Sequence, residues 1–108
     1  MEILKRLLDV MNQKEAINTV VLDMRKTPIP ADFFVIATAN SQTHMSTLRD
    51  AVVEFFLENN HNLIYFDKGE GYDWLLIDAG DIVVHIFTAH GREFYDLEGL
   101  WGDTAKLF

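Results

Sequence analysis

Hydrophobic residues recur at two different spacings along the chain, and these spacings predict its helices and strands. In residues 1–15 apolar side chains return every three or four positions between charged ones, which is the period of an amphipathic helix. Residues 41–58 repeat this pattern, with Ser41 as a helix cap and Asn59 and Asn60 at the end. Runs of β-branched and aromatic residues predict five strands, at residues 17–24, 32–39, 63–66, 74–78 and 82–88.

The order of these elements predicts an α/β fold in a single domain spanning residues 1–108. The helix that follows the second strand must cross the sheet, so at least one pair of strands should be parallel. The segment after Gly91 is expected to form a short helix. We therefore predict a mixed five-stranded sheet with helices packed on it, in the order helix, strand, strand, helix, three strands, short helix.

Residues 78–81, Asp-Ala-Gly-Asp, lie between two apolar runs and indicate a tight hairpin turn. A turn centred on Ala79 and Gly80 sets Asp78 opposite Asp81. The same register gives the remaining opposed pairs: Ile77 and Ile82, Leu76 and Val83, Leu75 and Val84, and Trp74 and His85.

The two faces of this hairpin differ in chemistry. One face is wholly aliphatic, as expected beneath helices: Leu75, Ile77, Ile82, Val84 and Ile86. The other face mixes aromatic, aliphatic and polar residues: Trp74, Leu76, Asp78, Asp81, Val83, His85 and Phe87. A tryptophan surrounded by polar groups is typical of a protein interface. Alternatively, a further element covers Trp74 and Phe87 and turns this face into core.

The last part of the chain is rich in large apolar side chains, which cannot all enter the core of a small domain. They occupy five positions: Phe94, Tyr95, Leu97, Leu100 and Trp101. We expect Tyr95 and Leu97 to complete the core and Trp101 to border the mixed face of the hairpin.

The chain carries 17 acidic residues against nine Lys and Arg, a net charge of -8. This charge repels phosphate backbones and attracts basic proteins. Alternatively, the acidic residues only keep a small protein soluble. The first helix carries Glu2 and Asp9, unlike a signal peptide, and no apolar run reaches the roughly 18 residues that span a membrane. We expect a cytoplasmic protein that binds neither membrane nor nucleic acid.

Residues that could support catalysis or metal binding have simpler structural explanations. Asp78 and Asp81 flank a tight turn, and Ser41 lacks the Gly-x-Ser-x-Gly frame of a nucleophile. Residues 69–71, Gly-Glu-Gly, lack the spacing of a phosphate-binding loop. There is no cysteine, and the four histidines lack metal-ligand spacing: His44, His61, His85 and His90. The sequence therefore predicts no enzyme, no metal and no cofactor.

Several sequence blocks are distinctive when taken together in order: Val-Leu-Asp at 21–23, Asp-Phe-Phe-Val-Ile-Ala-Thr at 32–38, Glu-Gly at 70–71, Asp-Trp-Leu-Leu-Ile-Asp at 73–78, Gly-Asp-Ile-Val-Val-His-Ile-Phe at 80–87 and Arg-Glu-Phe-Tyr-Asp-Leu-Glu-Gly-Leu-Trp at 92–101. Through these blocks the chain closely resembles the ribosomal silencing factor family, also called Iojap-like proteins. The resemblance extends from the first helix to Trp101. The loop between Gly71 and Trp74 is shorter than the family pattern, which could reshape the surface beside Trp74 and leaves open whether Glu70 contacts the partner.

The resemblance implies a nucleotidyltransferase-like fold and a role in translation without catalysis or cofactor. It implies binding to the large ribosomal subunit through its ribosomal protein number fourteen, which blocks joining of the small subunit when nutrients are short. The family's tryptophan falls on Trp74, and the adjoining surface falls on Asp78, Asp81 and His85. With the mixed hairpin face and the tail, this predicts the partner-binding residues: Trp74, Leu76, Asp78, Asp81, His85, Phe87 and Trp101.

Two other functions fit the sequence less well. Nucleotidyltransferases need a Gly-Ser motif followed by two carboxylates one residue apart to hold catalytic metal, whereas Asp50 alone follows Ser41. An RNA-binding regulator would need a basic stripe beside its aromatic residues, and none is present. Self-association as a homodimer would hide part of the apolar patch in the free protein.

Overall fold

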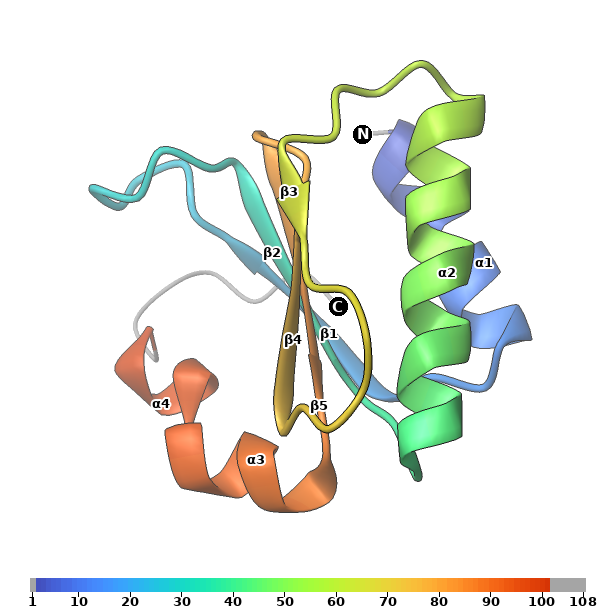
Figure 1. Ribbon diagram of the computed structural model, residues 1–108. Coiled ribbons are helices and arrows are strands. Elements are labelled where there is room, and N and C mark those ends of the chain that lie inside the picture. The colour runs from blue at the N-terminus through green and yellow to red at the C-terminus, as the bar shows by residue number, and fades with distance from the viewer. Residues whose placement is uncertain (1, 102–108) are drawn as a thin grey trace.

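The computed structural model describes residues 2–101, which form one mixed sheet with helices on both faces (Figure 1). The elements are α1 (Glu2–Gln13), β1 (Ile17–Asp23), β2 (Phe33–Thr38), α2 (Gln42–Glu58), β3 (Tyr65–Phe66), β4 (Trp74–Asp78), β5 (Ile82–Phe87), α3 (Ala89–Tyr95) and α4 (Leu97–Leu100). The predicted order is confirmed, with the expected short helix divided into α3 and α4.

The strands lie in the order β1-β2-β5-β4-β3, so the last strand in the sequence occupies the centre of the sheet. β5 runs parallel to β2, from the pair Phe33 and Ile82 to the pair Thr38 and Phe87. The other neighbouring strands are antiparallel. The expected parallel pairing is confirmed, and it joins β2 to β5.

α1 and α2 cover one face of the sheet and enclose the larger core (Figure 1). Leu7 and Met11 of α1 and Phe56 of α2 are fully buried against strand residues such as Ile77 and Val84. Burying each of these side chains contributes about 1.5–3 kcal/mol. Ser41 caps α2 as predicted, because its hydroxyl oxygen accepts a hydrogen bond from the backbone N–H of His44.

The opposite face holds a second, smaller core beneath α3 and α4, which are the orange helices of Figure 1. Its buried residues come from three strands, the loop after β1, and α4: Val20, Leu22, Met24, Ala31, Phe34, Ile36, Val83, Phe87 and Leu97. Leu97 therefore completes the core as expected. Tyr95 does not, because its side chain remains about half exposed.

The register of the β4–β5 hairpin differs from the prediction by two residues. Trp74 pairs with Phe87 rather than with His85, and Asp78 pairs with Val83. The backbone N–H of Ala79 bonds to the carbonyl of Ile82, so the loop is Gly80 and Asp81. Gly80 has a φ of 85°, which suits the first central position of a type II′ turn. A shift of two residues preserves the alternation of faces, so both predicted strand faces are retained.

Candidate partner-binding site

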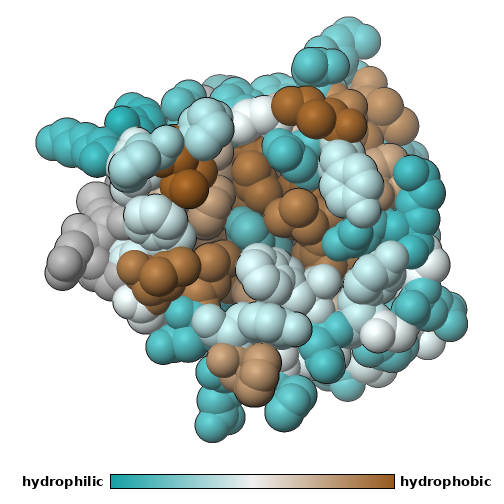
Figure 2. All heavy atoms as spheres, turned by 60° about the vertical axis from the view of Figure 1, so that its left-hand side comes forward, coloured by the Kyte–Doolittle hydropathy of each residue, from teal (hydrophilic) through white to brown (hydrophobic). Residues whose placement is uncertain are grey.

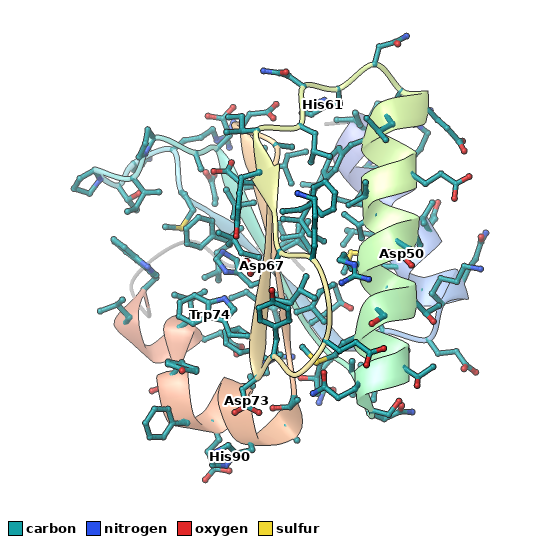
Figure 3. The ribbon with its side chains drawn as sticks, in the orientation of Figure 1. Asp50, His61, Asp67, Asp73, Trp74 and His90 are labelled. Carbon is teal, nitrogen blue, oxygen red and sulfur yellow. The ribbon has the colours of Figure 1, made fainter. Side chains whose placement is uncertain are left out.

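Trp74 begins β4 and lies on the side of the sheet that carries α3 and α4 (Figure 3). Its indole N–H donates a hydrogen bond to Nδ1 of His85 over 3.0 Å. Its ring stacks on Phe87 with centroids 5.3 Å apart, and the ring of Tyr95 lies 4.9 Å away. These contacts from β5 and α3 fix the half-buried tryptophan at the surface.

Asp73, the residue before Trp74, holds α3 beside this tryptophan. Thr88 caps α3 by accepting from the N–H of Gly91, and its hydroxyl donates to the Asp73 carboxylate over 2.9 Å. Gly91 packs so closely that an added Cβ would lie 2.3 Å from the carbonyl oxygen of Asp73. This contact brings Tyr95, at the end of α3, onto Trp74.

Four aromatic side chains form a continuous group at this surface, here called the aromatic patch: Trp74, His90, Phe94 and Tyr95. The ring of Tyr95 meets Phe94 edge to face at 5.1 Å, and Phe94 stacks with His90 at 6.0 Å. The side chains of Phe94 and Tyr95 are 71% and 48% exposed. Figure 2 shows apolar side chains gathered over the centre of this face, with polar side chains around them. An exposed aromatic group of this kind is typical of a docking surface.

Two of the predicted contact residues, His85 and Phe87, are buried in the structure. His85 is 3% exposed and Phe87 is fully buried, because both face the second core. Burial lowers the pKa of His85 to about 3, so its imidazole is neutral. The expectation that these side chains form the surface is therefore wrong for the described structure, where they support Trp74 from within.

The turn carboxylates also differ from the prediction. Asp78 accepts a hydrogen bond from the backbone N–H of Gly80, which confirms its role in the turn. Asp81 lies in the two-residue loop instead of opposite Asp78, and its carboxylate contacts Nε2 of His61 at 2.6 Å. It therefore pairs with the segment after α2 rather than with the mixed hairpin face.

Leu76 and Trp101, the other predicted contact residues, are both partly buried against the second core. The backbone N–H of Leu76 donates to the carboxylate of Asp67. Trp101 ends α4, where its backbone N–H donates to the carbonyl of Leu97. Their roles in partner binding stay predictions.

Arg92 connects α3 to the rest of this face. Its guanidinium contacts the carboxylate of Glu98 at 2.8 Å and donates to the hydroxyl of Thr38 over 3.0 Å. These residues line a hollow of about 640 Å³ with the acidic side chains of Glu93 and Asp96. Three carboxylates against one guanidinium give this part of the surface a negative character.

The loop that carries Glu70 lies on the other side of the sheet, curling toward α2 (Figure 1). Gln42 on α2 accepts from the N–H of Gly71 and donates to the carbonyl of Tyr72. Arg49 donates to the carbonyl of Gly69. These bonds hold the exposed Glu70 with α2, on the face opposite to the aromatic patch.

The groups considered for metal binding or catalysis do not converge. Within residues 2–101, no three His, Cys, Asp or Glu side chains are arranged to hold a metal ion. Figure 3 shows Asp50 on α2, across the sheet from Trp74, while His61 and His90 lie at opposite ends of the molecule. His44 contacts the carbonyl of Lys14 with Nε2. Over the same described range, no helix is long and apolar enough to cross a membrane.

Sequence reasoning missed the contribution of α3 to the surface. Thr88, three residues before Gly91, has the spacing of a helix cap, and this signal could have placed the helix start. The packing of Gly91 on Asp73 has no comparable signal, because it depends on tertiary contact. The sequence alone therefore predicts Tyr95 in the core, whereas in the structure its ring packs against Trp74.

Comparisons with known proteins identify relatives over nearly the whole chain. The family described as "Ribosomal silencing factor during starvation" matches residues 1–107. The ribosomal silencing factor RsfS of Halalkalibacterium halodurans is 35% identical over 98% of this chain and 91% of its own length. The protein of the same name from Bacillus subtilis is 36% identical over 94% of this chain and 86% of its own. These names describe a regulatory factor rather than an enzyme.

The fold is likewise similar to a solved structure. A crystal structure of a Chromobacterium violaceum protein matches with a TM-score of 0.87 and 29% identity, covering 94% of this chain and 84% of that one. This agreement supports the α/β arrangement of the mixed sheet and its helices. The wider relation to nucleotidyltransferases stays a prediction.

Proposed function

The chain belongs to the ribosomal silencing factor family, and from this premise we propose that it represses translation by binding the large ribosomal subunit. The proposed partner is a basic ribosomal protein, number fourteen of that subunit. The bound domain blocks the approach of the small subunit by its volume. This action needs no catalysis and no cofactor, and it operates when nutrients are short.

The aromatic patch is the observation that supports this proposal. The ring of Trp74 packs against the rings of Phe87 and Tyr95, and Phe94 and Tyr95 are exposed beside it. Interfaces concentrate their binding energy in tryptophan and tyrosine anchors of this kind. The side chain of Trp74 therefore supplies binding energy, because docking of the partner excludes water from around its ring.

The charge of the chain supports a basic partner. The net charge is -8, and carboxylates of Glu93, Asp96 and Glu98 lie around the hollow beside α3. Complementary charge accelerates association and rejects acidic competitors. A free ribosomal RNA backbone would be repelled by the same charges, so a protein is the favoured contact.

Light scattering of purified subunits tests the proposal directly. Large subunits are first mixed with the protein, small subunits are then added, and the scattering of joined ribosomes is followed with time. We expect joining to decrease as the protein approaches saturation. Full joining at saturating protein would contradict the proposal.

A variant pair ties this activity to the aromatic patch. Trp74→Ala should weaken binding to large subunits by about 2 kcal/mol or more, roughly 30-fold, because it removes a central anchor. Leu57→Ala is a matched control, since Leu57 is an exposed apolar residue of α2 on the far side of the sheet. Equal affinities of the two folded variants would remove Trp74 from the interface.

A further inference from the structure

We propose that His85 is a positioning residue for Trp74, whose indole it holds in the orientation presented to the partner. This inference rests on the proposed function, because it explains how the partner-binding tryptophan is oriented. His85 is buried and would not touch the partner itself. Its contribution is made through the ring of Trp74.

The geometry of the hairpin brings the two side chains together. Trp74 pairs with Phe87 and Leu76 pairs with His85, so Trp74 and His85 are diagonal neighbours on one sheet face. The indole Nε1 lies 3.0 Å from Nδ1 of His85, and the ring centroids lie 5.8 Å apart. The contact is therefore a directed hydrogen bond in addition to ring packing.

The imidazole is itself held firmly. His85 lies in the central strand β5, and its ring meets the ring of Phe34 at 4.5 Å on the side of β2. Because Nδ1 accepts from Trp74, the ring hydrogen of the neutral imidazole is on Nε2. The acceptor thus has a fixed position relative to the sheet.

The other nitrogen of the ring shows that this imidazole is costly to bury. Nε2 of His85 is buried and has no hydrogen-bond partner within the part of the chain that the structure describes. An unpaired buried N–H opposes folding, and a leucine of similar size would avoid that cost. Within the described residues the imidazole of His85 makes one hydrogen bond, to the indole of Trp74, and a leucine side chain could not make it.

The hydrogen bond also limits what Trp74 offers to a partner. Its only polar group, the indole N–H, is already bonded to His85. A partner therefore meets the carbon surface of the indole, which suits aliphatic groups or the guanidinium and ammonium groups of basic residues. A carbonyl or carboxylate of a partner would find no donor there.

Three substitutions separate the hydrogen bond from the packing of the ring. His85→Asn places an amide oxygen near the position of Nδ1, whereas His85→Gln extends its amide toward Nε2. His85→Leu keeps a similar volume without any acceptor. The chain has two tryptophans, so the indole N–H signal of Trp74 in a ¹H–¹⁵N spectrum is assigned with Trp101→Phe.

The first readout is the exchange of the Trp74 indole N–H with solvent in the free protein. We expect exchange to be about tenfold faster in His85→Leu and His85→Gln, because one net hydrogen bond is worth about that factor. The exchange rate in His85→Asn should remain close to that of the unchanged protein, because the asparagine amide oxygen can still accept the hydrogen bond. Exchange that is the same in all four proteins would overturn the proposal.

The second readout is binding to purified large subunits. Binding should weaken about tenfold in His85→Leu and His85→Gln and much less in His85→Asn. Faster exchange with unchanged binding in those two variants would overturn the positioning role. If His85→Leu fails to fold, His85→Asn is compared with His85→Gln. Equal indole exchange rates and equal affinities of these two variants would contradict the proposal.

The two readouts also separate this inference from the proposed function. If the unchanged protein does not bind large subunits, the proposed function fails. The exchange measurement still reports whether His85 holds the indole in the free chain. If the protein binds but its indole exchanges at the same rate in every variant, only the role of His85 is lost.

Discussion

We expect His85 to couple the stability of this domain to pH, because burial disfavours the charged form of its imidazole in the folded chain. Its pKa is lowered by burial from an ordinary value of 6.5 to about 3. Between these values the unfolded chain binds a proton that the folded chain does not bind. The free energy of unfolding should therefore decrease as the pH falls through this range.

Urea unfolding between about pH 7 and pH 4.5 tests this coupling. Below pH 6.5 the unchanged protein should lose about 1.4 kcal/mol per pH unit more than His85→Asn, which lacks the titrating group. Asp23, whose pKa is lowered to about 2 by its bonds to Arg25, is common to both proteins and cancels in the comparison. Parallel pH profiles would show that His85 is not the group responsible.

Single residues were predictable from the sequence where local chemistry determines their role. Ser41 and Asp78 bond to backbone groups two or three residues away, so helix and turn patterns were sufficient to assign them. The hydrogen bond between Trp74 and His85 connects two strands and depends on the register. The burial of His85 depends further on Phe34 of β2, which the local pattern does not contain.

At the scale of elements, the short helix α3 determines how Trp74 is presented. It is joined to β4 by the bonds of Thr88 to Asp73 and by the close approach of Gly91. A helix of seven residues is too short to be stable alone, so these contacts fix its position. The aromatic patch therefore depends on a junction outside the patch itself.

Gly91→Ala is expected to disturb this junction. Alanine favours a helix by about 1 kcal/mol over glycine, but its Cβ would lie 2.3 Å from a backbone oxygen, and relieving such overlap costs about 1–3 kcal/mol. We expect net destabilisation in thermal unfolding and weaker binding of large subunits, since Tyr95 moves away from Trp74. Glu93→Ala, two residues later on the exposed side of α3, is the control for stability. A more stable Gly91→Ala protein would indicate that α3 adjusts without strain.

The hairpin shows what strand periodicity can and cannot determine. Alternation with a period of two correctly assigned its strand residues to the face beneath α1 and α2 and to the mixed face. It could not distinguish registers that differ by two residues, because both keep the same faces. The turn decided the register, and Gly80 occupies its first central position rather than its second.

At the scale of the whole molecule, the charge of -8 should govern how quickly the partner is found. Raising the salt from about 50 to about 300 mM should slow association with large subunits several-fold and change dissociation less. Stopped-flow or surface-based kinetics would measure both rates. Trp74→Ala should show the opposite pattern, with faster dissociation and nearly normal association. An association rate that is independent of salt would argue against a basic partner surface.

The order of elements and the mixed sheet were predictable, but the neighbours of each strand were not. Apolar periodicity identified α1, α2 and the five strands, since each must bury one face, whereas the start of α3 and its separation from α4 were not predicted. Which strand lies beside β2 depends on contacts between distant segments, such as Phe33 with Ile82. Contacts between distant segments also decide which apolar side chains of this face are buried in the second core and which remain exposed in the aromatic patch.

The central position of β5 has a consequence for the synthesis of the protein. Because β5 is the last strand made among residues 2–101, a nascent chain that ends before residue 82 can pair β1 with β2 and β3 with β4, but it cannot join the two pairs. Folding of the sheet must therefore await synthesis through residue 87, and long-range pairing of this kind is slow. Until then neither His85 nor α3 is in place beside Trp74, so the docking surface proposed for a ribosomal subunit is not yet formed on the growing chain.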